Sequence, residues 1–425
     1  MAAVALMAAA CSNDVNDVLT PEAPQKVKHL IATIAPKTFD ATTRALVDNE
    51  NGTLSASWEV GETMALSLIA GYSFNTTAEV KKVNDDGSAI IEADFSEFTP
   101  EDGSTFEISY PADYNYLEQD GTLSTARDIR FGVAKVKVDG DVVTFTESIT
   151  LQPQCAIVGF TLTDITKNDA LFVKKMVITF KYEGVNYLFT ITPTDLSNAD
   201  YLYVTMFPSK DTEVWFEATS RDGNPYIAKG TANLEAGKFY QTDLKMATVG
   251  NVIGSDGKFY KDAAAAGTAA EAMIAYLGTE AEDADHGLAI ALEKASANYV
   301  TWDATGENNG GKTAAELVDA WANIHAVTGG TWRLPSAYDW QRMFIGCGST
   351  HEYVSSLSNM EFGYGNFFTL WKSATSSSFL SYCYWTSTTS GSECAWVVSF
   401  ESSTVSFDGQ QYKDCIYRVQ ACLAF

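Results

Sequence analysis

The sequence predicts a mostly β protein: two β-sandwich domains over residues 45–150 and 151–249, followed by an α+β domain over residues 250–425. From residue 54 to residue 246, short runs of alternating apolar and polar residues are separated by turns rich in Gly, Asp and Asn. Alternation with period two is typical of half-buried strands, and many short strands joined by such turns favour sandwiches. Beyond residue 250, two helical patterns and a concentration of tryptophans indicate a different kind of module.

The length, composition and net charge of the chain indicate how many domains it has and which kinds of partner are excluded. The chain has 425 residues, of which 46% are hydrophobic and 19% charged, values that fit a globular protein of two or three domains. Its formal net charge is -26. Such an excess of acidic groups excludes nucleic acid and anionic membrane as main partners, because nothing would neutralise their phosphates.

The sequence predicts no cofactor, no metal and no catalytic residue. No glycine-rich loop joins a strand to a helix, as a nucleotide site requires. The seven cysteines form no Cys-x-x-Cys pair, and four histidines leave little material for a zinc site or a Ser–His–Asp triad. The acidic run at residues 280–285 lacks EF-hand spacing, so we interpret it as a solvated loop.

The N-terminal segment indicates export. Residues 1–10 are small or apolar but too short to span a membrane. The three alanines before Cys11 resemble a bacterial lipobox, so residues 1–11 are interpreted as a signal-peptide remnant in which Cys11 is lipidated. A polar tether follows and contains an expected strand at residues 27–34. Arg44, followed by Ala45 in a polar segment, is a candidate protease site.

Within the two sandwiches, strands are expected wherever β-branched and aromatic residues alternate with polar ones. The expected strands are residues 64–69, 142–145, 156–162, 176–182, 201–207 and 213–218.

In the last domain we expect an amphipathic helix over residues 314–327, ended by Gly329 and Gly330. A second helix should begin after Ser336 as N-cap, with Asp339 as its capping-box partner. The alanine-rich stretch from residue 263 is expected to be a loop that leads into a strand. The strands expected in this domain are residues 273–277, 287–292, 384–386, 395–400, 405–407 and 417–421.

The first half resembles a known family in motifs that occur in the same order. They are residues 42–45 (TTRA), 58–62 (WEVGE), 110–111 (YP) and 234–244 (LEAGKFYQTDL). Together with the lipobox they resemble the fimbrillin-like proteins of Bacteroidetes, lipoprotein pilins with two transthyretin-like β-sandwich domains. The resemblance implies an outer-membrane lipid anchor and cleavage between Arg44 and Ala45, which removes residues 12–44. A strand from another pilin subunit would then fill the vacated groove at the cell surface.

The last third resembles a second family in residues 330–340 (GTWRLPSAYDW), 384–387 (YWTS), 395–396 (AW) and 417–419 (YRV). These resemble the Fibrobacter major paralogous domain, related to C-type lectin-like and formylglycine-generating-enzyme-like folds. The resemblance implies two helices packed on a twisted antiparallel sheet. The calcium-dependent sugar-binding motifs of C-type lectins are absent, and Cys415 and Cys422 do not suit a copper site, so we predict a binding module and no enzyme.

A polar stretch rich in Ser, Tyr and Asp provides the candidate ligand face. The candidate residues are Ser381, Tyr382, Cys383, Ser390, Glu393, Ser402, Thr404, Ser406, Asp408, Asp414 and Tyr417. Trp332 and Trp340 are interpreted as scaffold, and Trp385 and Trp396 as half-buried supports for these loops.

The favoured function is a fimbrial tip adhesin that binds a host or bacterial glycan or protein. The alternative is a monomeric surface lipoprotein that binds a glycan or protein, including a receptor diversified by a retroelement. Pairing among Cys383, Cys394 and Cys415 is left open by their spacing.

Overall fold

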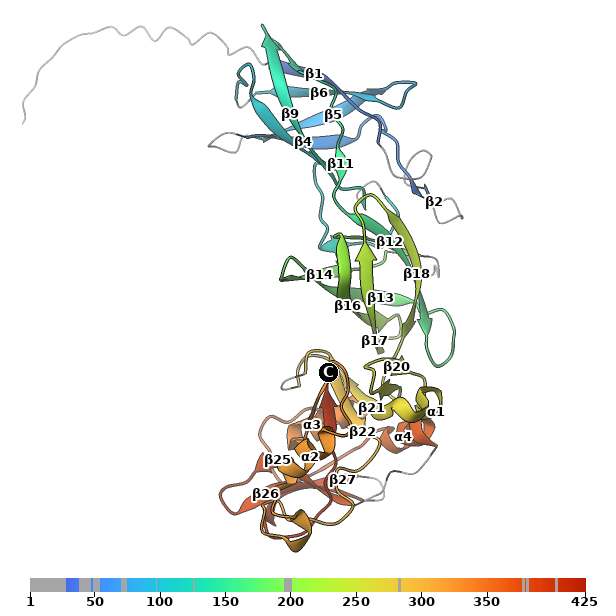
Figure 1. Cartoon of the computed structure of the whole chain (residues 1–425), viewed down its shortest axis with the longest axis vertical. Helices are drawn as coiled ribbons and strands as arrows, with labels where there is room; N and C mark the ends of the chain where they lie inside the picture. Colours follow the sequence, from blue (N-terminus) through green and yellow to red (C-terminus); the bar gives the residue numbers. More distant parts are fainter. Residues whose placement is uncertain are drawn as a thin grey trace, which may run out of the picture. The chain divides into compact units, whose positions relative to one another are not determined.

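The computed structural model describes residues 28–37, 47–48, 54–69, 75–96, 98–124, 127–194, 201–281, 284–376, 379, 382–401 and 404–425 (Figure 1). The chain divides into two compact units. The first contains the chain up to Pro36, Trp58–Ala112 and Gly132–Leu151, and the second contains Lys37–Ser57, Asp113–Phe131 and Gln152–Phe425. Within the range 45–150 predicted for the first sandwich, residues 47–48 and 54–57 and the described part of 113–131 lie with the second unit.

The described strands of the first unit are hydrogen-bonded into a closed ring, in the order β10-β1-β6-β5-β4-β7-β9 with β9 also paired to β10. Their bounds are β1 (Lys28–Ile34), β4 (Thr63–Leu68), β5 (Asn75–Val83), β6 (Ala89–Phe95), β7 (Thr105–Tyr110), β9 (Arg130–Asp139) and β10 (Val142–Phe145). The expected strands at residues 64–69 and 142–145 are thus present, the first ending one residue early.

Strand β1 is an integral part of this ring. It pairs antiparallel with β6 from Lys28↔Phe95 to Ile34↔Ala89, and in parallel with β10 at His29↔Val142. Leu30, Ala32 and Ile34 point into the core of the unit and are buried. The strand expected at residues 27–34 is confirmed for its described part, and its alternation of apolar residues fixes which face is inward.

The second unit begins with two sheets that enclose one apolar core. One has the order β15-β12-β18, formed by β15 (Leu202–Met206), β12 (Ala156–Asp164) and β18 (Phe239–Met246). The other has the order β17-β16-β13-β14-β8, formed by β17 (Pro225–Leu234), β16 (Ser209–Ser220), β13 (Val173–Tyr182), β14 (Val185–Ile191) and β8 (Glu118–Gln119). Strand β12 lies parallel to β18 from Ile157↔Phe239 to Asp164↔Met246. In the same unit β2 (Val47–Asp48) pairs with β3 (Leu54–Ser55), and β11 (Gln152–Pro153) pairs with the start of β9.

The C-terminal module of this unit contains two further sheets and the helices. The larger sheet has the order β20-β19-β21-β22-β28-β23, formed by β20 (Phe259–Tyr260), β19 (Val252–Gly254), β21 (Ala270–Leu277), β22 (Gly287–Ala291), β28 (Cys422–Ala424) and β23 (Thr331–Arg333). The smaller has the order β24-β27-β26-β25, formed by β24 (Met360–Phe362), β27 (Val405–Tyr412), β26 (Cys394–Phe400) and β25 (Cys383–Thr389). The helices are α1 (Ala263–Ala266), α2 (Ala314–Ala322), α3 (Ala337–Gly346) and α4 (Phe367–Thr375), with 3-10 turns η2 (Gly267–Ala269) and η3 (Glu307–Asn309).

Local capping chemistry sets the start of two helices. The Ser336 side chain accepts a hydrogen bond from the Asp339 backbone, and the Asp339 carboxylate accepts one from the Ser336 backbone, so the predicted capping box of α3 is confirmed. Thr313 and Glu316 form the same motif at α2. Within the described residues, no helix combines the length and apolar character needed to cross a bilayer.

The predicted end of the first helix is wrong. Helix α2 ends at Ala322, before the glycine pair that was expected to cap it. Beyond that point the His325 ring stacks on Trp321 and its Nδ1 lies 3.0 Å from a carboxylate oxygen of Glu271, while Ile324 is 81% exposed. The contacts of His325 stabilise a non-helical backbone after Ala322. Tertiary packing therefore overrides the apolar spacing that predicted a helix up to residue 327.

Two other local predictions need correction. The alanine-rich stretch forms the single turn α1, capped by the Asp262 side chain, and the following strand begins at Ala270, three residues earlier than expected. Residues 417–421 were expected to be a strand, but only isolated bridges occur there, Val300↔Tyr417 and Tyr384↔Arg418. The regular strand is β28, which begins at Cys422. Helix α4 was not predicted.

The tryptophans of the module are core residues. Trp340 and Trp385 are completely buried, and Trp332 and Trp396 are 7% exposed. Trp340 packs among phenylalanines and Tyr384 in one core, whereas Trp385 belongs to a second core. The scaffold role predicted for Trp332 and Trp340 fits this burial. The prediction that Trp385 and Trp396 are half-buried is wrong, because Trp385 packs into one core of the module and Trp396 into the other.

Candidate functional site

The smaller sheet of the C-terminal module brings part of the predicted ligand face together. Cys383 pairs with Ser399, which pairs with Ser406, so these residues lie on one rung across β25, β26 and β27. Asp408 lies two residues beyond Ser406 and therefore on the same face. Cys383, Ser406 and Asp408 are half-buried, so they are accessible only in part.

Tyr417 lies beside this group. Its ring packs edge-on against Trp385 with 4.8 Å between ring centroids, and its O–H donates to Gln411 Oε1 at 2.5 Å. Burial raises the pKa of Tyr417, and electrostatic interaction with Cys415, Cys383 and Asp408 raises it further. The four groups are thus close enough to interact electrostatically, and Cys415 is a member that the candidate set did not include.

The other described candidates lie at two different ends of the sheet. Ser390 and Glu393 are exposed in the turn between β25 and β26, near the exposed Asp414. The Glu393 carbonyl accepts from the Lys413 backbone at 2.9 Å, which holds these turns together. Tyr382 and Thr404 lie at the other end, where their carbonyls accept from Phe400 and Glu401. The nine described candidates therefore do not converge on one site.

Five predicted site residues lie outside the described part of the chain. They are Cys11, Arg44, Ala45, Ser381 and Ser402. Lipidation, cleavage and the two serine contacts therefore stay predictions.

The sequence reasoning missed the side chains that surround Tyr382. The guanidinium carbon of Arg418 lies 5.0 Å from the Tyr382 ring centroid and 4.2 Å from that of Tyr299, and Lys294 Nζ lies 5.6 Å from the Tyr382 centroid. The sequence shows that basic residues are few in this acidic chain. It does not indicate which of them lie close together in the fold.

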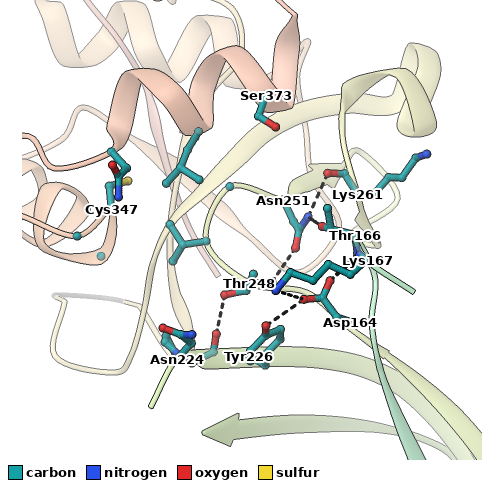
Figure 2. A pocket seen from close by; sticks show the side chains of 17 residues that line it. Asp164, Thr166, Lys167, Asn224, Tyr226, Thr248, Asn251, Lys261, Cys347 and Ser373 are labelled. Carbon is teal, nitrogen blue, oxygen red and sulfur yellow. Dashed lines mark hydrogen bonds and ion pairs between the residues drawn. The ribbon is translucent and has the colours of Figure 1, made fainter. Parts of the chain in front are cut away.

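A crevice of about 390 Å³ lies in the second unit between the end of the sandwich and the C-terminal module. Figure 2 shows polar groups of its lining bonded to one another. The Asn251 amide donates to Thr166 Oγ1 at 2.7 Å and to the Lys261 carbonyl at 3.0 Å. The Tyr226 O–H donates to Asp164 Oδ2 at 3.0 Å. Burial and Asp164 raise the pKa of Tyr226 to about 12.

A stacked group strengthens the same junction. The His286 ring lies on Trp215 with 3.9 Å between centroids, and its Nδ1 lies 2.7 Å from Glu217 Oε1. Lys229 Nζ lies 4.7 Å from the Trp215 centroid and pairs with Glu213 at 2.7 Å. These contacts satisfy the polar groups internally, so we interpret the crevice as a structural junction that holds the module on the sandwich.

The described cysteines are all free thiols in this structure and fall into two sets of three. Cys155, Cys347 and Cys422 are buried, and burial raises the pKa of the Cys155 thiol to about 12 and raises the pKa of the other two. The set that is half-buried is Cys383, Cys394 and Cys415.

We expect iodoacetamide at pH 8 to alkylate the half-buried set at least about tenfold faster than the buried set, because the thiolate is the reactive form and needs access. Peptide mass spectrometry over a time course measures both rates. The same experiment in denaturant serves as control, since all six thiols should then react alike. Protection of Cys383 and Cys415 in the native chain would contradict the prediction.

Comparisons with known proteins give weak structural similarity. No family model and no curated protein matches the chain. A fimbrial protein from Bacteroides ovatus is 11% identical, with 94% of this chain and 99% of that chain covered and a TM-score of 0.27. A fimbrial assembly protein from Parabacteroides distasonis is also 11% identical, with 51% and 90% covered and a TM-score of 0.26. A shaft pilin from Lactobacillus rhamnosus GG is 11% identical, with 52% and 97% covered and a TM-score of 0.25.

TM-scores this low do not transfer a role to the chain, so its function is inferred from its own residues. Among the described residues, no group of three His, Cys, Asp or Glu side chains is placed to hold a metal ion.

Proposed function

We propose that this chain is a fimbrial subunit that assembles by strand addition and presents its C-terminal module as a ligand-binding tip. In this proposal Cys11 carries the outer-membrane lipid anchor before cleavage, and an arginine-specific protease cuts between Arg44 and Ala45. The partners are other pilin subunits and a glycan or protein ligand. The position and pairing of β1 support the proposal most directly.

A cut after Arg44 would break the covalent link between strand β1 and the rest of the unit, so that β1 could dissociate. The strand precedes Arg44 in the chain, so only its hydrogen bonds to β6 and β10 and its buried side chains would hold it after cleavage. Its loss would leave two strand edges unpaired and uncover the apolar core around Leu30 and Ile34. Exposed edges and core both favour addition of a strand from another chain.

The C-terminal strand supports a tip position. Strand β28 is hydrogen-bonded on one edge to β22 and on the other to β23, so it is committed to the module and is not free to enter a neighbouring subunit. Strand β18 leads almost directly into β19, with only residues 247–251 between them. A subunit that accepts a strand from a neighbour, while β28 stays in its own module, donates no such strand onward. It would lie at the end of a filament.

One observation favours the alternative, a monomeric surface lipoprotein. Before any cut the ring of the first unit is closed, and Ile34 is completely buried. An uncut chain therefore has no vacant strand position in the described ring.

The test is cleavage of the full chain by an arginine-specific protease, followed by addition of a synthetic peptide with the β1 sequence, Lys28–Ile34. We expect N-terminal sequencing to give Ala45, and the labelled peptide to exchange into the cut chain but not into the uncut one. A peptide with aspartate in place of Leu30 and Ile34 is the control and should not bind. If the cut chain takes up neither peptide, or if the native surface protein retains residues before Ala45, the assembly proposal fails.

A further inference from the structure

Lys294, Tyr299, Tyr382 and Arg418 form a basic-aromatic cluster on the C-terminal module. The Arg418 guanidinium lies over both tyrosine rings, 4.2 Å from the Tyr299 centroid and 5.0 Å from the Tyr382 centroid. The two rings meet edge-on with 5.9 Å between centroids, and Lys294 Nζ lies 5.6 Å from that of Tyr382. All four side chains are half-buried, so the cluster is open to solvent in part.

The two cations of the cluster have no carboxylate partner among the described residues. Arg418 Nη1 donates to the Ala297 carbonyl, and its Nε is buried with no hydrogen-bond partner in that part of the chain. The neighbouring Glu293 directs its carboxylate toward His325 Nε2, 3.9 Å away. Burial lowers the pKa of Lys294, and the adjacent Arg418 charge lowers it further.

The cluster places two cations side by side in a chain with a formal net charge of -26. Two other cations of the second unit pair with acids: Lys229 with Glu213 at 2.7 Å and Arg333 with Asp339 at 2.8 Å. Two adjacent positive charges without an anion repel each other, and a bound anion removes that cost. The cluster is therefore matched to a negatively charged group supplied from outside the described chain.

The backbone holds Arg418 in position. Its N–H donates to the Cys383 carbonyl and its carbonyl accepts from the Trp385 backbone, both at 3.0 Å. Tyr417, next to it, exchanges two backbone hydrogen bonds with Val300, which follows Tyr299. The guanidinium and the tyrosines are thus positioned before any ligand arrives, which lowers the entropic cost of binding.

We propose that the basic-aromatic cluster binds the carboxylate of an acidic sugar. The planar guanidinium fork matches a carboxylate, and Lys294 adds a second positive charge. The Tyr299 and Tyr382 hydroxyls form no hydrogen bond within the described residues, so they are available to the hydroxyl groups of a sugar ring. The inference rests on the proposed ligand-binding role of the module and is independent of strand addition.

The experiment compares methyl β-D-glucuronide with methyl β-D-glucoside, which differ only in the carboxylate at C6. Binding to the full chain is measured by saturation-transfer NMR and by titration. We expect the glucuronide to bind at least about tenfold more tightly than the glucoside, since a charge-assisted contact of this kind is worth about that factor. Lys294→Gln should weaken glucuronide binding about tenfold and leave the glucoside unchanged.

Lys413→Gln is the matched control. Lys413 also lies over an aromatic ring of the module, 4.7 Å from the Trp302 centroid, and its removal changes the net charge equally. This variant should bind the glucuronide as the unsubstituted chain does. Tyr382→Phe removes the hydroxyl group and keeps the aromatic ring. A loss of sugar affinity in this variant would show that the sugar ring binds at the cluster.

Three outcomes would overturn the inference: equal binding of the two glycosides, no binding of either, or equal weakening by Lys294→Gln and Lys413→Gln. Equal binding would leave a sugar-binding module in place and would remove only the carboxylate site. Uptake of the β1 peptide by the cut chain, measured on the same variants, reports on the assembly proposal separately.

Discussion

Deletion of Cys422–Phe425 is expected to unfold the C-terminal module. These residues contain β28, which lies between β22 and the edge strand β23 of the larger sheet. The Phe425 carbonyl also accepts from the His286 and Gly287 backbones at 2.7 and 3.0 Å. Cys422 and Ala424 belong to one core of the module, and Leu423 and Phe425 to the other.

The expected effect is large because two kinds of stabilisation disappear together. Burial of a Leu or Phe side chain contributes about 1.5–3 kcal/mol each, and each backbone hydrogen bond contributes about 0.5–1.5 kcal/mol. Their sum approaches the whole stability of a typical domain, about 5–15 kcal/mol. We expect loss of near-UV circular dichroism and of the thermal transition of the module.

Ile416→Ala is the control for this deletion. Ile416 is in the same terminal segment but is 56% exposed, so its truncation should change the free energy of unfolding by less than about 0.5 kcal/mol. If the deleted chain retains native near-UV circular dichroism, β28 does not hold the module together.

Ile34→Ala is expected to destabilise the first unit by about 2–5 kcal/mol, the usual cost of truncating a fully buried isoleucine. Ile31 provides an internal comparison, since it is on the same strand but is 47% exposed and paired opposite Glu92. Ile31→Ala should cost less than about 0.5 kcal/mol. Equilibrium urea unfolding, followed by probes in each unit, measures both values. Equal effects of the two substitutions would mean that β1 does not pack as described.

The contrast between these isoleucines also explains why much of the fold was predictable. Strands such as β1, β12 and β13 carry their inward face in a local alternation that the sequence displays directly. The capping box of α3 is equally local, because Ser336 and Asp339 lie within one turn. These elements needed no knowledge of distant contacts.

The predictions were wrong where contacts between residues far apart in the sequence determine the local structure. Helix α2 ends early because His325 meets Glu271, 54 residues away in the chain, and the Trp332 indole N–H donates to the His325 carbonyl. The burial of Trp385 depends on Tyr417, which comes from another part of the sequence. No local pattern contains that information.

The candidate site was predictable only in part for the same reason. Alternation along β27 places Ser406 and Asp408 on one face, but the register that brings Cys383 beside them comes from strand pairing. The basic-aromatic cluster combines Lys294 with Arg418, which are far apart in the sequence of the module. Spacing in the sequence gave no reason to connect them.

The parallel pairing of β12 and β18 has a mechanical consequence. These are the first and last long strands of the sandwich, and they lie side by side from Ile157↔Phe239 to Asp164↔Met246. A pulling force applied between the start of β12 and the end of β18 drives the two strands past each other along their length. All the hydrogen bonds between them then resist in shear at once, whereas a force across one end would open them one by one. A molecule that is anchored on one side and loaded through its C-terminal module would gain resistance to flow from this arrangement.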